Sequence, residues 1–210
     1  MTSVRIQRVV TSGTFSLDGG TWEVENNVWL IGDDSEVLVI DAAHNADAIV
    51  STVRGRRVTA LVCTHAHDDH VNRAFDVARR TEAAVHLHPA DRPLWDMSYD
   101  DRLPDAWLSD EQVLRVADVD VHVLHTPGHA PGAVCLYVPA LSTVFTGDTL
   151  FQGGPGATGR SYSDYPTIVA SIRDRLLTLP PETVVRTGHG DDTSIEAEAP
   201  ALEEWLAKLS

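Results

Sequence analysis

Hydrophobic and polar positions along the chain form short runs with two different periods. Runs rich in β-branched residues, either alternating with polar residues or uninterrupted, predict strands, and they recur from the N-terminal region to residue 187. The expected strands cover 4–10, 27–31, 37–41, 58–64, 85–88, 113–116, 119–124, 133–138, 143–146 and 183–187. Strands therefore outnumber helices in the predicted fold.

Apolar residues at three- and four-residue spacing predict fewer helices, which lie between and after the strands. The expected helices cover 46–54, 71–80, 90–97, 165–179 and 200–209. Asp164 is a suitable N-cap for the fourth helix, and Pro166 is tolerated in its first turn. The polar stretch 98–112 and the glycine-rich stretch 151–161 predict loops. Two sheets packed together with helices outside satisfy this order of elements.

Length and charge narrow the class of protein. The 210 residues contain no linker and no repeat, which predicts a single domain over 1–210. A net charge of −15 would repel nucleic-acid phosphates, so we expect no nucleic-acid partner. We also expect no membrane segment, because no apolar run approaches about 18 residues. The N-terminus lacks a signal-peptide core, which predicts a cytoplasmic protein, and Cys63 and Cys135 should be buried, reduced thiols.

Candidate chemistry is concentrated directly after one apolar strand. The segment Thr64-His65-Ala66-His67-Asp68-Asp69-His70 places four ligand-type side chains within six residues, where a strand end fixes the backbone. Imidazole nitrogen and carboxylate oxygen suit Zn, Fe or Mn. Three further candidates each stand next to a glycine after a strand: His129, Asp148 and His189. A polar loop with incidental histidines is the alternative, but such loops rarely gather this many ligands.

These motifs together resemble the metallo-β-lactamase superfamily, and within it the small glyoxalase II-like (hydroxyacylglutathione hydrolase-like) enzymes. The resemblance runs from the early strands to Gly190 and implies a four-layer αββα sandwich, an α/β (α+β) fold with metals at one edge of the sheets. It also implies two divalent ions, with Zn expected and Fe or Mn as alternatives. The implied ligands are His65, His67 and His129 for one metal, Asp69, His70 and His189 for the other, and Asp148 between both.

The remaining histidines and Asp41 receive supporting roles. Asp41 ends its strand and is predicted to orient a ligand, although it could equally cap the following turn. His125, close to His129, is the strongest candidate among the other histidines for supporting a metal ligand from outside. Arg160 follows the glycine-rich loop and is predicted either to clamp a substrate carboxylate or to be a solvated surface residue. Tyr162 is a candidate for lining the mouth, with packing as its alternative role. The other four histidines are expected to be structural or supporting: His44, His86, His88 and His122.

The predicted reaction is hydrolysis of an acyl thioester by a hydroxide that bridges two metals held by Asp69 and Asp148. A thiolate can leave without a general acid, and the sequence offers no separate acid with a motif of its own. The larger glyoxalase II enzymes grip glutathione with basic residues after the last motif, whereas Asp191 and Asp192 follow here and Lys208 is the single lysine. Glutathione is therefore not the expected thiol. Mycothiol is the alternative, since 15 arginines to one lysine are typical of a GC-rich genome.

Three other functions stay open. A lactonase would share all seven ligands. A persulfide dioxygenase would use one iron held by His65, His129 and Asp148. A β-lactamase fits less well, because those enzymes place a Cys where Asp148 stands and lack His70. From a different class, a binding module would keep the metal only for structure, but structural Zn sites are usually closed and rich in Cys. The expected partner is a small-molecule substrate, and the oligomeric state is left open.

Overall fold

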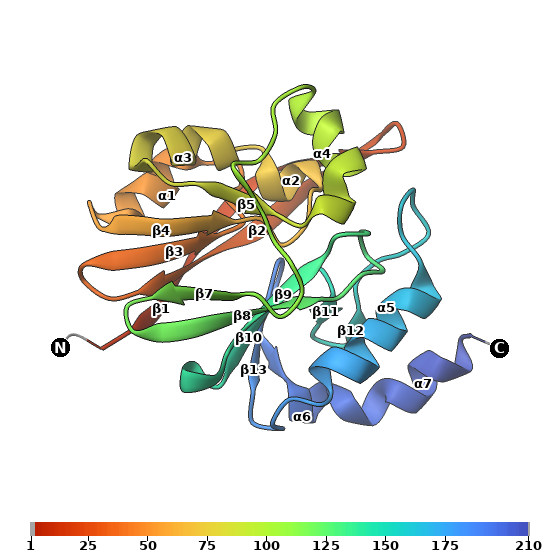
Figure 1. Cartoon of the computed structure of the whole chain (residues 1–210). Helices are drawn as coiled ribbons and strands as arrows, with labels where there is room; N and C mark the ends of the chain where they lie inside the picture. The colour runs from red at the N-terminus through yellow and green to blue at the C-terminus, as the bar shows by residue number, and fades with distance from the viewer. Residues whose placement is uncertain (1–2, 210) are drawn as a thin grey trace.

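Two six-stranded sheets lie face to face, with helices on both outer sides (Figure 1). The structure, a computed structural model, describes residues 3–209. The first sheet contains, in spatial order, β1 (Arg5–Leu17), β2 (Gly20–Gly32), β3 (Glu36–Ile40), β4 (Arg57–Val62), β5 (Val85–Leu87) and β6 (Ala106–Trp107). The second contains, again in spatial order, β14 (Thr193–Ser194), β13 (Val184–Thr187), β10 (Thr143–Gly147), β9 (Val134–Val138), β8 (Val119–His125) and β7 (Val113–Val116).

Seven helices form the outer layers of the described part of the chain. They are α1 (Ala46–Val53), α2 (Asp68–Val71), α3 (Ala74–Thr81), α4 (Arg92–Tyr99), α5 (Tyr165–Ser171), α6 (Ile195–Glu198) and α7 (Leu202–Ala207). Helices α1 and α3 cover the first sheet, while α5 and α7 cover the second (Figure 1). The short α2 carries two of the predicted ligands.

Three apolar clusters account for the layers. In β3, Val37 and Val39 face the outer helices, whereas Leu38 and Ile40 face the second sheet. Between the sheets, Trp29 packs edge-on against Phe145 at 5.7 Å. A strand buried on both faces reads as a continuous apolar run, which explains why such strands were found from sequence. This arrangement confirms the predicted αββα sandwich.

The first two predicted strands are longer than expected. Segments 4–10 and 27–31 belong to one hairpin, in which β1 and β2 each have 13 residues. The turn at Asp18 and Gly19 has positive φ at both residues, 53° and 77°, as two-residue hairpin turns require. The sequence pattern did not predict the half of the hairpin near the turn, because that half carries many exposed polar residues.

Several element boundaries were also wrong. The ligand segment 65–70 is helical from Asp68 onwards. The helix predicted at 71–80 therefore begins earlier, and it is divided into α2 and α3. Asp164 caps α5 as predicted, accepting from the Thr167 N–H at 2.9 Å, but the helix ends in a π-helical turn at Ile172–Leu176. The predicted loops contain β6, and the short pair β11 (Leu150–Phe151) and β12 (Gly154–Pro155).

The last predicted helix, 200–209, is shorter and does not stand alone, because α6 and a 3₁₀ turn precede α7. No helix within residues 3–209 has both the length and the apolar character needed to cross a membrane.

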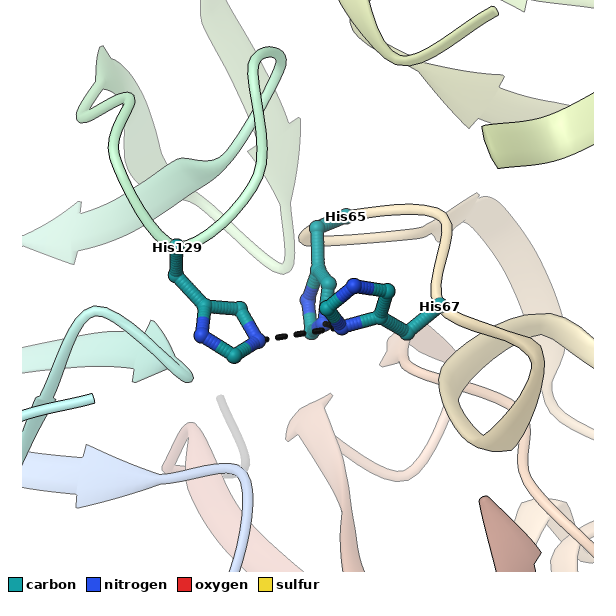
Figure 2. A group of neighbouring side chains, drawn as sticks. All are labelled: His65, His67 and His129. Atoms are coloured by element: carbon teal, nitrogen blue, oxygen red, sulfur yellow. Dashed lines mark hydrogen bonds between the residues drawn. The ribbon is translucent and has the colours of Figure 1, made fainter. Parts of the chain in front are cut away.

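Strand ends position the candidate site. Strands β4, β8, β10 and β13 all lead into loops that bear predicted ligands. In Figure 2, loops from the two sheets carry histidines that face one another. Because each sheet contributes side chains from its ends, the candidates gather at one edge of the sandwich.

Candidate metal centre

All seven predicted ligands lie together. Their ligand atoms form three overlapping groups, and within each group all atoms lie within 4.8 Å of one another. The groups are His65 with His67 and His129; His65 with His70 and Asp148; and Asp69 with His70 and His189. Five of these side chains are buried, whereas those of Asp148 and His189 are 11% and 25% exposed.

The first group consists of three imidazoles from two loops (Figure 2). The ring of His67 points its Nδ1 towards Nε2 of His65 and towards Nε2 of His129, each at 3.0 Å. Two ring nitrogens converge on a third, so a single cation could accept all three lone pairs.

The second group lies beside the first. Nε2 of His70 is 3.2 Å from Nε2 of His189, and Oδ2 of Asp69 is 3.5 and 3.4 Å from these two nitrogens. Asp148 stands between the groups. Its Oδ1 is 3.3 Å from Nε2 of His70, and its Oδ2 is 3.5 Å from Nε2 of His129. One carboxylate therefore reaches both.

Hydrogen bonds on the outer side of the rings fix their orientation. Nδ1 of His70 donates to Oδ2 of Asp41 at 3.0 Å. Oγ1 of Thr64 donates to the same oxygen at 2.7 Å and lies 3.2 Å from Nδ1 of His65, from which it can accept. When these rings are neutral, their Nε2 lone pairs point into the centre. Asp41 thus has the orienting position that the sequence predicted.

His129 and His189 are oriented in the same way, but by backbone carbonyl groups. Nδ1 of His129 donates to the carbonyl of Ala157 at 2.8 Å, and Nδ1 of His189 donates to the carbonyl of Glu25 at 2.7 Å. When neutral, each ring is therefore held in the tautomer that leaves Nε2 free for a metal.

Unpartnered polar atoms show that protein groups alone do not satisfy this cluster. Oδ1 of Asp148 is buried without a hydrogen-bond partner among the described residues, and so is Nε2 of His67, the ring nitrogen other than the one that faces His65 and His129. Burying such atoms is costly unless something pairs with them. The imidazoles and carboxylates form a set of ligands that fits divalent ions. The loops also pack too closely for a larger residue at Gly188, because a Cβ there would overlap Oδ1 of Asp148.

The two groups differ in protonation. Burial, aided by His129, lowers the pKa of His67 to about 3, and burial also lowers the pKa of His65. Burial alone would lower the pKa of His189, but Asp148 and Asp69 raise it to about 10, and the pKa of His70 is raised in the same way. The first group thus presents neutral rings at pH 7, whereas the second holds protons that a metal must displace.

A cleft of about 80 Å³ opens over the centre. Its lining comprises Phe15, Val24, His67, Asp69, His129, Asp148, Ala157, Arg160 and His189. The Arg160 guanidinium lies 4.1 Å from the ring centre of Trp22 and 5.3 Å from that of Phe15. Asp18 at the hairpin tip accepts from the Ser161 N–H at 2.9 Å, which joins the hairpin to the loop of Arg160.

The remaining predicted site residues lie further out. Tyr162 is 45% exposed with a φ of 70° and does not line the cleft. His125 contacts no predicted ligand: its Nε2 lies 2.9 Å from the Pro131 carbonyl, within the loop of His129, and its ring stacks on His88. It therefore supports that loop rather than a ligand ring.

Sequence reasoning missed two buried side chains that hold the ligand loops. Asp91 accepts from the Ala66 N–H at 2.7 Å and from the Gly132 N–H, so it links the loop of His65 to the loop of His129. Asn26, from β2, donates to Asp69 at 3.0 Å. Neither residue stands in a motif, and both depend on contacts between segments far apart in the sequence.

Comparisons with known proteins agree with this geometry. Residues 21–189 match the family model of the metallo-beta-lactamase superfamily. Among curated relatives, hydroxyacylglutathione hydrolase GloC of Haemophilus influenzae is 30% identical, over 83% of this chain and 90% of that protein.

Two solved structures are similar in both sequence and fold. TTHA1623 in a di-iron-bound form is 33% identical with a TM-score of 0.74, covering 84% of this chain and 93% of that one. The BLEG-1 B3 metallo-beta-lactamase is 27% identical with a TM-score of 0.77, covering 90% of this chain and 97% of that one.

Proposed function

The chain belongs to the metallo-beta-lactamase superfamily, and from that premise we propose that it is a metal-dependent hydrolase that cleaves acyl thioesters of a low-molecular-weight thiol. The relative whose name states hydrolysis of hydroxyacylglutathione supports this substrate class. The observation that carries the proposal is a cleft whose histidines and carboxylates all belong to the seven converging ligands, so that with metals bound none of them would be left to protonate a leaving group.

We assign His65, His67 and His129 to one divalent ion, Asp69, His70 and His189 to a second, and Asp148 to both. The donor set suits Zn, and the di-iron relative supports Fe as the alternative. Such ions supply a water nucleophile of lowered pKa and a Lewis acid for the substrate carbonyl. The residues of the chain hold these positions through the outer hydrogen bonds of the imidazoles.

The carboxylates in the cleft cannot serve as proton donors. Burial alone would raise the pKa of Asp69 and of Asp148, but positive charge on His70 and His189 holds both below the usual value. Bound cations would act in the same direction. A thiolate, whose conjugate acid has a pKa of about 8.5, leaves more readily without protonation than the more basic alkoxide of an ester. This asymmetry favours a thioester over an ordinary ester.

Arg160 is the candidate residue for binding the substrate outside the metal ligands. Among residues 3–209 it forms no ion pair, although 31 acidic residues are present in the chain and most other arginines pair with one of them. Its guanidinium lies along the cleft wall formed by Phe15 and Trp22. We assign it to an anionic group on the acyl or thiol part of the substrate. Glutathione and mycothiol are the two thiols to compare.

A second candidate, β-lactam hydrolysis, is favoured by the similarity to the BLEG-1 enzyme. Against it, the scissile amide needs a protonated leaving nitrogen, and with metals bound the histidines and carboxylates of the cleft would be ligands and not proton donors. We therefore rank it below thioester cleavage.

Thiol release tests the proposal. Protein loaded separately with Zn, Mn or Fe would be assayed on S-lactoylglutathione and on a mycothiol thioester, with Asp148→Asn as the inactive control. We expect metal-dependent thiol release that is lost in the variant. Oxygen uptake with a persulfide and no thiol release would replace the hydrolase with the dioxygenase. Turnover of lactones or of a chromogenic β-lactam alone would assign the site to those substrates.

A further inference from the structure

Strand β2 contributes a buried amide to the second metal group. Nδ2 of Asn26 donates to Oδ2 of Asp69 at 3.0 Å, and the side chain of Asn26 is completely buried. The same Asp69 oxygen lies 3.5 Å from Nε2 of His70 and 3.4 Å from Nε2 of His189. Asn26 therefore acts on the atom that faces the second group.

The amide of Asn26 has only one orientation that satisfies its neighbours. Since its nitrogen donates to a carboxylate, its Oδ1 must accept a hydrogen bond, and Nε2 of His44 lies 2.8 Å away. His44 must then carry its proton on Nε2. Its Nδ1 lies 3.1 Å from Nδ2 of Asn72, which donates to it. Oδ1 of Asn72 accepts from the backbone N–H of His44 at 2.7 Å, so each of these donors meets an acceptor.

The backbone around His44 is built to keep this ring in place. His44 has a φ of 54°, in the left-handed region that favours glycine. A Cβ at Gly13 of β1 would overlap the imidazole, so the glycine makes room for it. Asn72 follows α2 directly, which ties His44 to the helix that carries Asp69 and His70. Burial lowers the pKa of His44, which favours the neutral ring.

The first metal group relies on different contacts. Its loops are joined by Asp91, and its His129 is oriented by the Ala157 carbonyl. No described contact connects Asn26 or His44 to His65 or His129. The two groups share Asp148, and Asp41 contacts His70 directly and His65 through Thr64, but the hydrogen bonds of Asn26 and His44 lead only to Asp69 of the second group.

We propose that Asn26 and His44 are positioning residues that hold Asp69 for the second metal and set the affinity of that site selectively. The inference rests on the proposed two-metal site, but not on the substrate. Removing the Asn26 amide would free Asp69 Oδ2 to rotate away, and removing the His44 donor would let the Asn26 amide flip. Partners of this kind typically contribute about 10- to 100-fold in metal affinity.

Stepwise metal titration of the chelated full-length protein tests the proposal. Zn²⁺ or Co²⁺ would be added to the wild type, Asn26→Ala, His44→Leu and His44→Gln, with competition by a chelator of known affinity. We expect the first ion to bind all four proteins equally. The second should bind about 10- to 100-fold more weakly to Asn26→Ala and His44→Leu. His44→Gln, whose amide can donate in place of Nε2, should recover much of the loss.

A neighbouring variant separates positioning from general destabilisation. Asn45 lies beside His44 and caps α1 by accepting from the Ala48 N–H at 3.0 Å. Asn45→Ala should lower the stability of the chelated protein without changing either metal affinity. Unchanged second-site affinity in Asn26→Ala would overturn the inference, as would equal weakening of both sites. A wild type that binds fewer than two ions would also overturn it, whatever its activity. Two ions without thioester cleavage would leave it standing and refute only the proposed substrate.

Discussion

Oδ2 of Asp41 accepts a hydrogen bond from Nδ1 of His70 at 3.0 Å, across 29 residues of sequence. The same carboxylate accepts from the backbone N–H and from the hydroxyl of Thr64, each at 2.7 Å. Strands β3 and β4 are parallel neighbours, and Asp41 and Thr64 follow their ends. Strand pairing thus brings a buried carboxylate to the root of the ligand loop, where it fixes both the backbone before His65 and the ring of His70.

Replacing Asp41 with alanine should weaken metal binding about 10- to 100-fold, because His70 loses its orienting acceptor. The chelated protein should also lose about 1–3 kcal/mol of unfolding free energy for a buried donor left unsatisfied. Metal titration and urea unfolding measure the two effects. Asp33→Ala is the control, since Asp33 accepts from the Ser35 and Glu36 N–H groups in a turn outside the site. Wild-type metal affinity in Asp41→Ala would contradict the assigned role.

Replacing Arg160 with alanine should raise KM about tenfold or more for an anionic thioester, because a charge-assisted hydrogen bond contributes about 1.5–3 kcal/mol. The effect should be small for an uncharged thioester of the same acyl group. Arg102→Ala serves as the matched control, since that guanidinium also lies over an aromatic ring, Phe75, and does not line the cleft. Equal KM changes for charged and uncharged substrates would exclude an anion-binding role for Arg160.

Adding a methyl group at Gly188 should abolish metal binding. A Cβ there would overlap Oδ1 of Asp148 and come within 2.9 Å of Cε1 of His70, so both side chains must shift. Gly190→Ala meets no atom within 4 Å and strains only a φ of 67°, which costs about 1 kcal/mol. Elemental analysis and circular dichroism of both variants separate loss of metal from loss of fold. A metal-replete Gly188→Ala protein would show that the close approach is not needed.

Metal uptake should release protons from the second group. The pKa of His189 is raised to about 10, so in the chelated protein this ring carries a proton at pH 7. A metal needs the neutral ring, so at least one proton per chain should be released at pH 7, and metal affinity should rise with pH. Calorimetric titration in buffers of different ionisation enthalpy measures the number. Metal binding without proton release would show that His189 is neutral or is not a ligand.

The same shift predicts how pH changes the stability of the chelated protein. A folded-state pKa raised above the unfolded value of about 6.5 stabilises the fold fully below pH 6.5, and this stabilisation is lost as pH rises towards 10. Urea unfolding of wild type and His189→Gln between pH 6 and 10 tests this. The unfolding free energies of the two proteins should converge at high pH. A difference that stays constant with pH would contradict the prediction.

The sequence was most informative where chemistry is local. His65, His67, Asp69 and His70 are close in the chain, and glycines mark the turns at Asp148 and His189, so the resemblance could assign roles before any contact was known. The αββα layers followed from apolar runs in strands such as β3 that are buried on both faces.

Contacts between distant segments could not be predicted in this way. Asn26 lies in the half of the hairpin whose polar pattern concealed the strand, and its partner Asp69 is 43 residues away. Asp91 carries no motif and becomes recognisable only through the Ala66 and Gly132 N–H groups that it accepts from. The cytoplasmic location and the single domain over 1–210 stay predictions.

The number of metal ions bound per chain tests the central claim most directly. Protein purified without added metal would be analysed for all divalent metals, alongside Asp148→Asn as the variant that removes the shared carboxylate charge. We predict about two ions per chain in the wild type and fewer in the variant, since one carboxylate reaches both groups. One ion or none in the wild type, or a full complement in Asp148→Asn, would contradict the two-metal centre.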